Sequence, residues 1–236
     1  MSCSNQSKED VPFALPQLID TFSNNLVLFE VDKMDISRFY PIYIGSDSVI
    51  ILNFLIAEYS NHLKMEIFIP NPEQRTKLYV DTSTIIGSSR RWYNVPPPPG
   101  MDSSYDPHIS FKSGRFKSMP IYIHNEGPDS ITFGHNAYLP LIVEAKDSMG
   151  IWQPIQRLRK MGCGTGLESY IIPPNQFMIS TVPLFKGNFK TLLRVRSVSS
   201  TVIINEVDES IEDLNRVIYS NEFEGFINYN QFKEMD

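Results

Sequence analysis

Apolar and polar residues alternate along most of this chain, in short runs that end at Gly, Pro, Asn or Asp. Successive side chains of a strand point to opposite faces of a sheet, so a period of two predicts β-strands. In the second half of the chain such runs cover residues 138–145, 151–155, 167–172, 176–182, 189–198 and 222–229. Turn residues roughly every 8–12 positions between alternating runs predict a mainly β protein, an antiparallel β-sandwich.

The first half of the chain follows the same pattern. Its strand-like runs cover residues 26–31, 41–44, 48–54, 64–69 and 76–81. The second and third of these runs flank Gly45, Ser46 and Asp47, and two β-rich runs around a short turn predict a hairpin.

One segment, residues 206–217, favours a short helix instead. Val207, Ile211, Leu214 and Val217 recur near the three-to-four spacing of a single helix face, with acidic residues between them.

A run of four prolines, residues 96–99, marks the strongest break in the pattern. Consecutive prolines adopt polyproline II and have no backbone N–H to join a sheet. We therefore expect a proline-rich linker or long loop over residues 96–114. On either side we expect an N-terminal β unit (25–95) and a C-terminal β-sandwich (115–236), preceded by a flexible tether (1–24). The two β units form either one sandwich or two.

The strand cadence of the second half resembles that of immunoglobulin-like β-sandwich domains. That resemblance implies a tryptophan in the core, for which Trp152 is the candidate. The pair of cysteines that bridges the two sheets of antibody domains is missing, because the chain has two cysteines, Cys3 and Cys163, one in each half.

Composition narrows the class of protein. Of 236 residues, 42% are hydrophobic and 12% aromatic, which argues against disorder. The formal net charge is −6, whereas nucleic-acid binders normally present a basic surface. Two cysteines are too few for a disulfide scaffold or a cysteine-rich metal site.

The N-terminus points to a cell compartment. Cys3 follows a small residue and precedes a polar run that includes Lys8, Glu9 and Asp10. This start resembles a mature bacterial lipoprotein of the Bacteroidota type, in which such a cysteine carries the lipid. The resemblance implies lipidation at Cys3 and an outer-membrane location, with a signal segment upstream of Met1. The longest apolar stretch, residues 49–57, is too short for a spanning helix, which needs about 20 residues. The alternative is a cytosolic protein in which Cys3 is incidental.

Candidate catalytic chemistry centres on Cys163, which lies among three glycines in residues 161–166. Backbone amides of such a loop can hold an oxyanion beside a thiolate. A thiol catalyst also needs a histidine partner, and none of His62, His108, His124 and His135 lies in a recognisable motif. We expect a tight interstrand loop, and a hydrolase built around Cys163 is the alternative.

The sequence predicts neither a metal site nor a cofactor. His124 and His135 flank one predicted hairpin at different heights along its two strands, so their imidazoles would not converge on a metal ion. We expect each of them to face solvent. Asp81, Glu144 and Asp147 end strands without the spacing of a calcium loop.

Two stretches carry candidate surface features: one is a candidate binding loop and the other a charged outer strand face. Arg90, Arg91, Trp92 and Tyr93 precede the prolines, and Arg and aromatic residues are enriched at recognition surfaces. The alternative is a loop that folds back, with Trp92 capping the sandwich. Arg194 and Arg196 alternate on one predicted strand and indicate a charged outer face. We therefore expect a non-enzymatic, envelope-associated β-sandwich protein with a binding or accessory role toward a protein or glycan. A cytosolic interaction protein is a further alternative.

Overall fold

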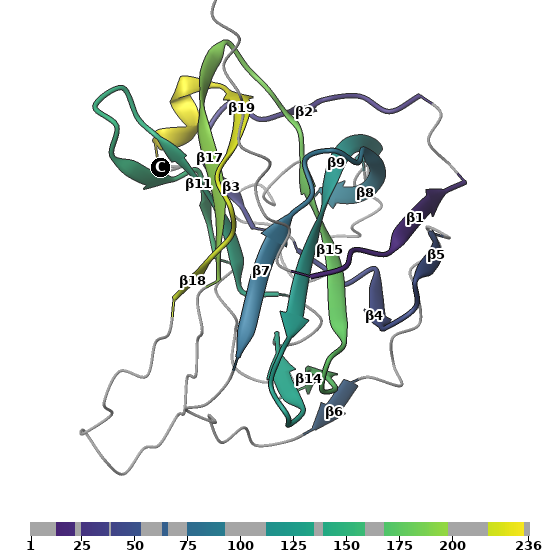
Figure 1. The fold of residues 1–236 in the computed structure, drawn as a ribbon. Helices are drawn as coiled ribbons and strands as arrows, with labels where there is room; N and C mark the ends of the chain where they lie inside the picture. The colour runs from purple at the N-terminus through teal and green to yellow at the C-terminus, as the bar shows by residue number, and fades with distance from the viewer. Residues whose placement is uncertain are drawn as a thin grey trace, which may run out of the picture.

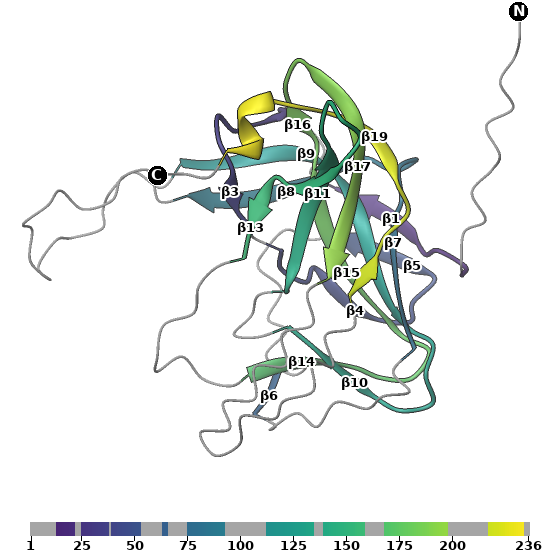
Figure 2. The ribbon, with the colours of Figure 1, turned by 90° about the vertical axis from the view of Figure 1, so that its left-hand side faces the viewer.

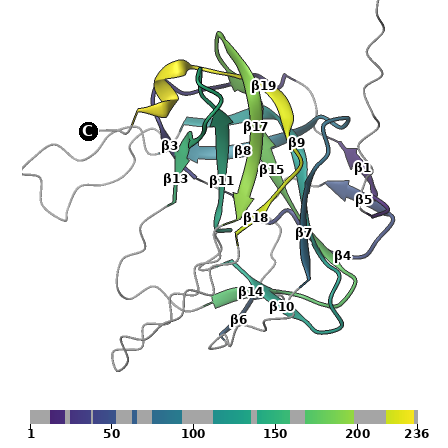
Figure 3. The same ribbon diagram turned by 60° about the vertical axis from the view of Figure 1, so that its left-hand side comes forward.

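The structure, a computed structural model, describes residues 13–21, 25–37, 39–52, 63–65, 75–92, 112–134, 139–158, 168–197 and 217–233. The predicted class is confirmed: the protein is mainly β, and its two largest sheets are antiparallel and pack face to face (Figure 3).

The first sheet is built around one long strand, β9. In spatial order its strands are β4 (Tyr43–Gly45), β15 (Phe177–Pro183), β9 (Lys112–Asn125) and β7 (Thr76–Val80), and β8 (Ile86–Trp92) also pairs with β9. On one edge β9 pairs with β15, and on the other it pairs first with β8 and then with β7. The sheet is labelled in Figure 1.

The second sheet is built around β17. In spatial order its strands are β12 (Trp152–Pro154), β11 (Leu141–Lys146), β17 (Phe189–Ser197) and β18 (Ile218–Tyr219), and β19 (Phe223–Ile227) pairs with β17 as well.

The core between the sheets is filled by alternate residues of both. The first sheet contributes Leu78, Val80, Ile121, Ile123, Met178 and Val182. The second contributes Leu141, Val143, Ala145, Leu193, Val195, Phe223 and Ile227. Because these residues are spaced by two along their strands, the alternation seen in the sequence accounts directly for the packing of the sandwich.

Shorter elements cover the ends and sides of the sandwich. They are the parallel pair β1 (Gln17–Asp20) and β5 (Val49–Leu52), and the three-stranded sheet β10 (Ile131–Phe133), β14 (Glu168–Ile172) and β6 (Leu63–Met65). Two further parallel pairs are β3 (Asp35–Ile36) with β13 (Gln156–Arg157) and β2 (Phe29–Glu30) with β16 (Phe185–Lys186), and η2 (Tyr229–Phe232) is a 3₁₀-helix. The β10–β14–β6 sheet lies at one end of the sandwich (Figure 2).

The two expected β units share one sheet. The first sheet takes β4, β7 and β8 from the expected N-terminal unit, and β9 and β15 from the expected C-terminal unit. Lys112–Asn125 begins inside the expected linker, whose residues 96–111 lie outside the described part. Strands of both expected units therefore build one sandwich.

The described end of the expected tether is folded onto this sandwich. Phe13, Leu15 and Leu18 pack with Tyr79 and Tyr122 on the outer face of the first sheet. The Phe13 ring meets both tyrosine rings edge-on, at centroid distances of 6.4 Å and 6.0 Å. Burial of these apolar side chains fixes residues 13–21 against the sheet, whereas the sequence predicted a flexible tether there.

The predicted hairpin of residues 41–54 is wrong. Its first strand, β4, pairs with β15, and its second strand, β5, pairs in parallel with β1. Ile44 and Ile50 belong to different apolar clusters, so the two strands separate to fill both. The predicted helix lies outside the described residues except for Val217, and the immunoglobulin-like topology stays a prediction.

Candidate functional site

The two sheets differ in what covers their outer faces. The N-terminal segment and β5 pack over the first sheet, whereas the second sheet carries charged and aromatic side chains on its outer face. Residues opposite each other in an antiparallel pair share a face. Glu144 lies opposite Arg194, Lys146 lies opposite Trp152, and Arg196 lies opposite Tyr219. We call these six residues the Arg194 face.

Glu144 is the buried centre of this face. Its side chain is only 6% exposed, and one carboxylate oxygen accepts hydrogen bonds from Arg194 Nε at 2.8 Å and contacts Nη2 at 2.7 Å. The other oxygen lies 2.9 Å from Arg196 Nε. A buried carboxylate is tolerated only where cations and hydrogen bonds compensate for its lost hydration, so Glu144 and Arg194 hold each other in one geometry.

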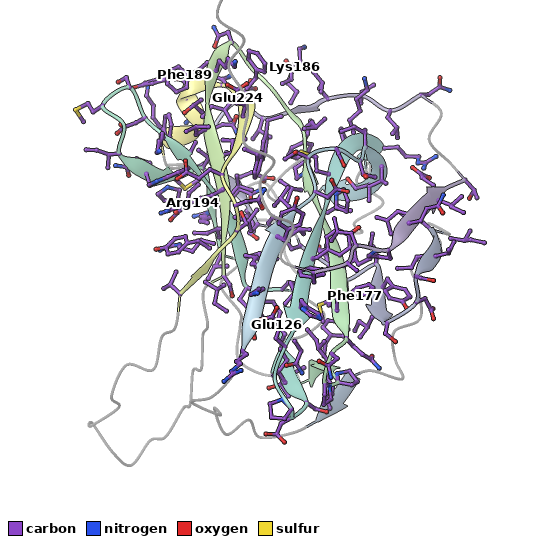
Figure 4. The ribbon with its side chains drawn as sticks, viewed as in Figure 1. Glu126, Phe177, Lys186, Phe189, Arg194 and Glu224 are labelled. Atoms are coloured by element: carbon purple, nitrogen blue, oxygen red, sulfur yellow. The ribbon has the colours of Figure 1, made fainter. Side chains whose placement is uncertain are left out.

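The Arg194 guanidinium is also held by two aromatic rings. It lies 4.2 Å from the ring centre of Trp152 and 3.9 Å from that of Tyr219. These rings come from β12 and β18, on opposite sides of the strand that carries Arg194, which is labelled in Figure 4. Each cation–π contact contributes about 0.5–2 kcal/mol, depending on exposure.

Two lysines of this sheet face are paired with carboxylates. Lys146 Nζ lies 4.8 Å from the Trp152 ring centre and 3.3 Å from a carboxylate oxygen of Glu222. On the neighbouring strands Lys190 pairs with Glu224 at 2.9 Å. These exposed pairs contribute little to stability, but they add charge to a rigid surface.

The arrangement is suited to recognition. Trp, Tyr and Arg dominate the residues that contribute most to protein–protein binding, and here one of each is held in mutual contact. Tyr219 is 45% exposed, and Phe226, which faces the same side opposite Lys190, is 50% exposed. The Arg194 face contains no thiol, hydroxyl–histidine pair or other activated nucleophile.

Trp152 corrects one expectation. It was the candidate core tryptophan, but it is half-buried on the outer face, in contact with Lys146 and Arg194. Its partner on β11 is Lys146, whose neighbour Ala145 faces the core, so the pairing register places Trp152 outside. The charged outer face expected from Arg194 and Arg196 is present. The sequence did not show the strand pairing that places Glu144, Trp152 and Tyr219 beside these two arginines.

The residues expected to form a binding loop are only partly described. Arg90, Arg91 and Trp92 end β8, where they pair with Gly114, Ser113 and Lys112 of β9. Their side chains and Tyr93 lie outside the described part, so their role stays a prediction. The same holds for lipidation at Cys3 and for a hydrolase site at Cys163, as neither cysteine is among the described residues.

His124 is the histidine that the structure describes, and its expected exposure to solvent is wrong. Its side chain is 14% exposed, and the Phe13 ring stacks on it at 4.4 Å. Burial lowers the pKa of His124, and Glu126, whose carboxylate lies 3.7 Å from Nδ1, acts in the opposite direction. Phe13, which covers His124, lies more than a hundred positions away in the chain, so the residues around His124 could not predict its burial.

The acidic strand ends have local roles. Asp81 accepts hydrogen bonds from the backbone and side chain of Ser83, and Asp147 accepts from the backbone of Met149 and Ile151. Such bonds hold turns. Within the described ranges, no group of three or more His, Cys, Asp or Glu side chains could hold a metal ion.

An apolar hollow of about 380 Å³ lies between β16 and β19. Phe185, Leu193 and Phe223 contribute to its lining, and the charged residues at it, Lys186 and Glu224, have ion-pair partners elsewhere, Glu30 and Lys190.

Among the described residues, no helix is long and apolar enough to cross a membrane. Comparison of the chain with protein-family models, with curated proteins and with solved structures finds no match.

Proposed function

We propose that this chain is a non-enzymatic binding or accessory protein of the bacterial envelope, that its Arg194 face binds a protein partner, and that Cys3 carries a lipid anchor. The observation that supports binding is the Arg194 guanidinium, fixed by the buried Glu144 carboxylate and by the rings of Trp152 and Tyr219. Side chains already ordered in the free protein lose little entropy on binding, which favours affinity.

A protein partner fits this face better than a glycan. Sugars bind to bare aromatic faces, and here the Trp152 and Tyr219 rings are already in contact with cations. The exposed side chains of Phe226 and Tyr219 offer apolar area at the rim instead. Apolar and aromatic area around a fixed arginine is typical of protein interfaces.

The envelope location rests on the N-terminus. Nine residues separate Cys3 from Phe13, where the described body begins, and an extended chain of that length reaches about 30 Å. A lipid at Cys3 would thus hold the sandwich close to a membrane surface without a spanning segment.

Lipidation is tested by metabolic labelling with an alkyne fatty acid, using the native reading frame upstream of Met1. We expect the label on the wild-type protein and its loss in Cys3→Ser. An unlabelled wild-type protein would favour the alternative of a cytosolic interaction protein.

Binding through the Arg194 face is tested by site-specific photo-crosslinking in cells of the source organism. We expect p-benzoylphenylalanine at Tyr219 to give a discrete cross-linked species, and Trp152→Ala to abolish it. The control position is Val49, which is 51% exposed on β5, at the outer side of the first sheet. The same pattern at both positions, or no cross-link at Tyr219, would contradict a partner at this face.

A further inference from the structure

Arg196 stands apart from the other cations of the second sheet. It lies two residues after Arg194 on the same face, and its side chain is 30% exposed. It reaches Glu144 through Nε, at 2.9 Å from Oε1 but without the alignment of a hydrogen bond. Among the described residues, its two Nη nitrogens have no hydrogen-bond partner.

The balance of charges shows why this matters. Lys146 pairs with Glu222 and Lys190 with Glu224, one carboxylate for each cation. The Arg194 and Arg196 guanidiniums share the single carboxylate of Glu144. Within the described part of this face, one positive charge is therefore not neutralised, and it resides on the more exposed arginine.

The geometry keeps this charge in a fixed place. Glu144 is held by Arg194, which is itself held by two rings, and Glu144 in turn fixes the Nε end of Arg196. The Nη end of a guanidinium is a planar fork that matches both oxygens of a carboxylate. An interface arginine ordered before binding needs little reorganisation to accept such a group.

We infer that the Arg194 face recognises an acidic segment of its protein partner, with Arg196 presenting its Nη nitrogens to an Asp or Glu carboxylate. This inference rests on the proposed function, and it adds the chemistry of the partner. The exposed Tyr219 and Phe226 side chains flank the same face and can cover apolar atoms of the bound segment.

The negative net charge of the protein opposes binding of an acidic peptide anywhere on its surface. The chain carries −6, so its overall field repels an acidic peptide. At about 0.15 M salt the Debye length is about 8 Å, so local attraction at Arg196 outweighs distant repulsion only for a peptide bound at that site.

The experiment measures binding of fluorescent hepta-aspartate and hepta-asparagine peptides to the full chain by anisotropy. We expect the aspartate peptide to bind the more tightly, and Arg196→Gln to weaken its binding at least about tenfold. Lys190→Gln is the matched control, because it removes one positive charge from the same face, and it should change binding by less than about twofold. Arg196→Lys keeps the charge but not the fork, and should give an intermediate loss.

Thermal unfolding of each variant checks that it is folded. We expect Arg196→Gln to fold, because Glu144 retains its hydrogen bond and ion pair with Arg194. Equal losses in Arg196→Gln and Lys190→Gln, equal binding of both peptides, or no binding of hepta-aspartate would overturn the inference. A Tyr219 cross-link without carboxylate binding would leave the proposed function in place and refute this inference alone. Carboxylate binding through Arg196 without any cross-link in cells would refute the proposed protein partner, and the inference with it, and would leave only carboxylate binding by Arg196 established.

Discussion

The side-chain amide of Asn221 forms hydrogen bonds with both backbone groups of Val80. Asn221 Oδ1 accepts from Val80 N at 2.8 Å, and Nδ2 donates to Val80 O at 3.0 Å. Val80 is in the first sheet, and Asn221 lies between the two strands β18 and β19 of the second. The amide thus takes the place of a neighbouring strand and ties the edge of β7 to the other sheet.

Replacement of Asn221 by Ala should destabilise the sandwich by about 1–3 kcal/mol, because the Val80 N–H and carbonyl lose their partners in a partly buried position. Urea denaturation followed by fluorescence measures the change. Asn188→Ala, at an exposed turn position, is the control and should stay within about 0.5 kcal/mol. Equal effects of the two substitutions would show that the hydrogen bonds between Asn221 and Val80 do not contribute to the free energy of unfolding.

Glu144→Gln should cost about 3 kcal/mol, because two arginines then lose the buried carboxylate that neutralises them. The matched change Glu224→Gln removes a 66% exposed carboxylate from its pair with Lys190, and should cost less than about 1 kcal/mol. Both free energies come from chemical denaturation at one pH. Similar values for the two variants would mean that Glu144 is not a central support of this face.

Stability should fall as the pH decreases through about 6.5, the ordinary pKa of His124. Burial lowers its pKa in the folded protein, so the unfolded chain takes up the proton more readily, and protonation favours unfolding. The effect is absent well above pH 6.5 and complete below the lowered pKa. Nearby Glu126 and Lys77, which pair at 2.8 Å, modulate it in opposite directions.

The measurement for His124 is the unfolding free energy between pH 8 and pH 5 for the wild type and for His124→Gln. The difference between the two proteins should change across this range in the direction given above. A constant difference, or one of opposite sign, would rule out His124 as the origin.

Gly187→Ala should prevent stable folding. A Cβ at this position would meet the backbone carbonyl of Ile227 and the backbone nitrogen of Asn228, neither of which can rotate away. We expect the free energy of unfolding to fall by more than about 3 kcal/mol, as checked by thermal unfolding and by the yield of soluble protein.

Gly150→Ala serves as the comparison for Gly187. Gly150 has a φ of +80° with open space around it, so its substitution should cost about 1 kcal/mol from the backbone alone. A Gly187→Ala variant no less stable than Gly150→Ala would show that β19 can move away from the turn before β17.

Strands that are apolar runs bounded by turn residues could be predicted closely. Residues 76–81, 176–182 and 189–198 were expected as strands and form Thr76–Val80, Phe177–Pro183 and Phe189–Ser197. Short apolar runs between turn residues are a local property of the chain, so the sequence is enough to locate these strands. It does not show that both faces of β15 are buried, with Met178 and Val182 in one apolar cluster and Phe177 and Ile179 in the other. Partners are not encoded locally, and β4 and β5 therefore looked like a hairpin although each pairs with a distant strand.

The sequence by itself determined that the chain builds sheets and which side of most strands is apolar, because those properties depend on the order of neighbouring residues. Only the tertiary structure decided that strands from both halves share one sheet, that Phe13 covers His124, and that Trp152 and Tyr219 meet at Arg194. These relationships depend on pairing register between segments far apart in the chain. A shift of one residue in that register would have turned the same side chains toward the core.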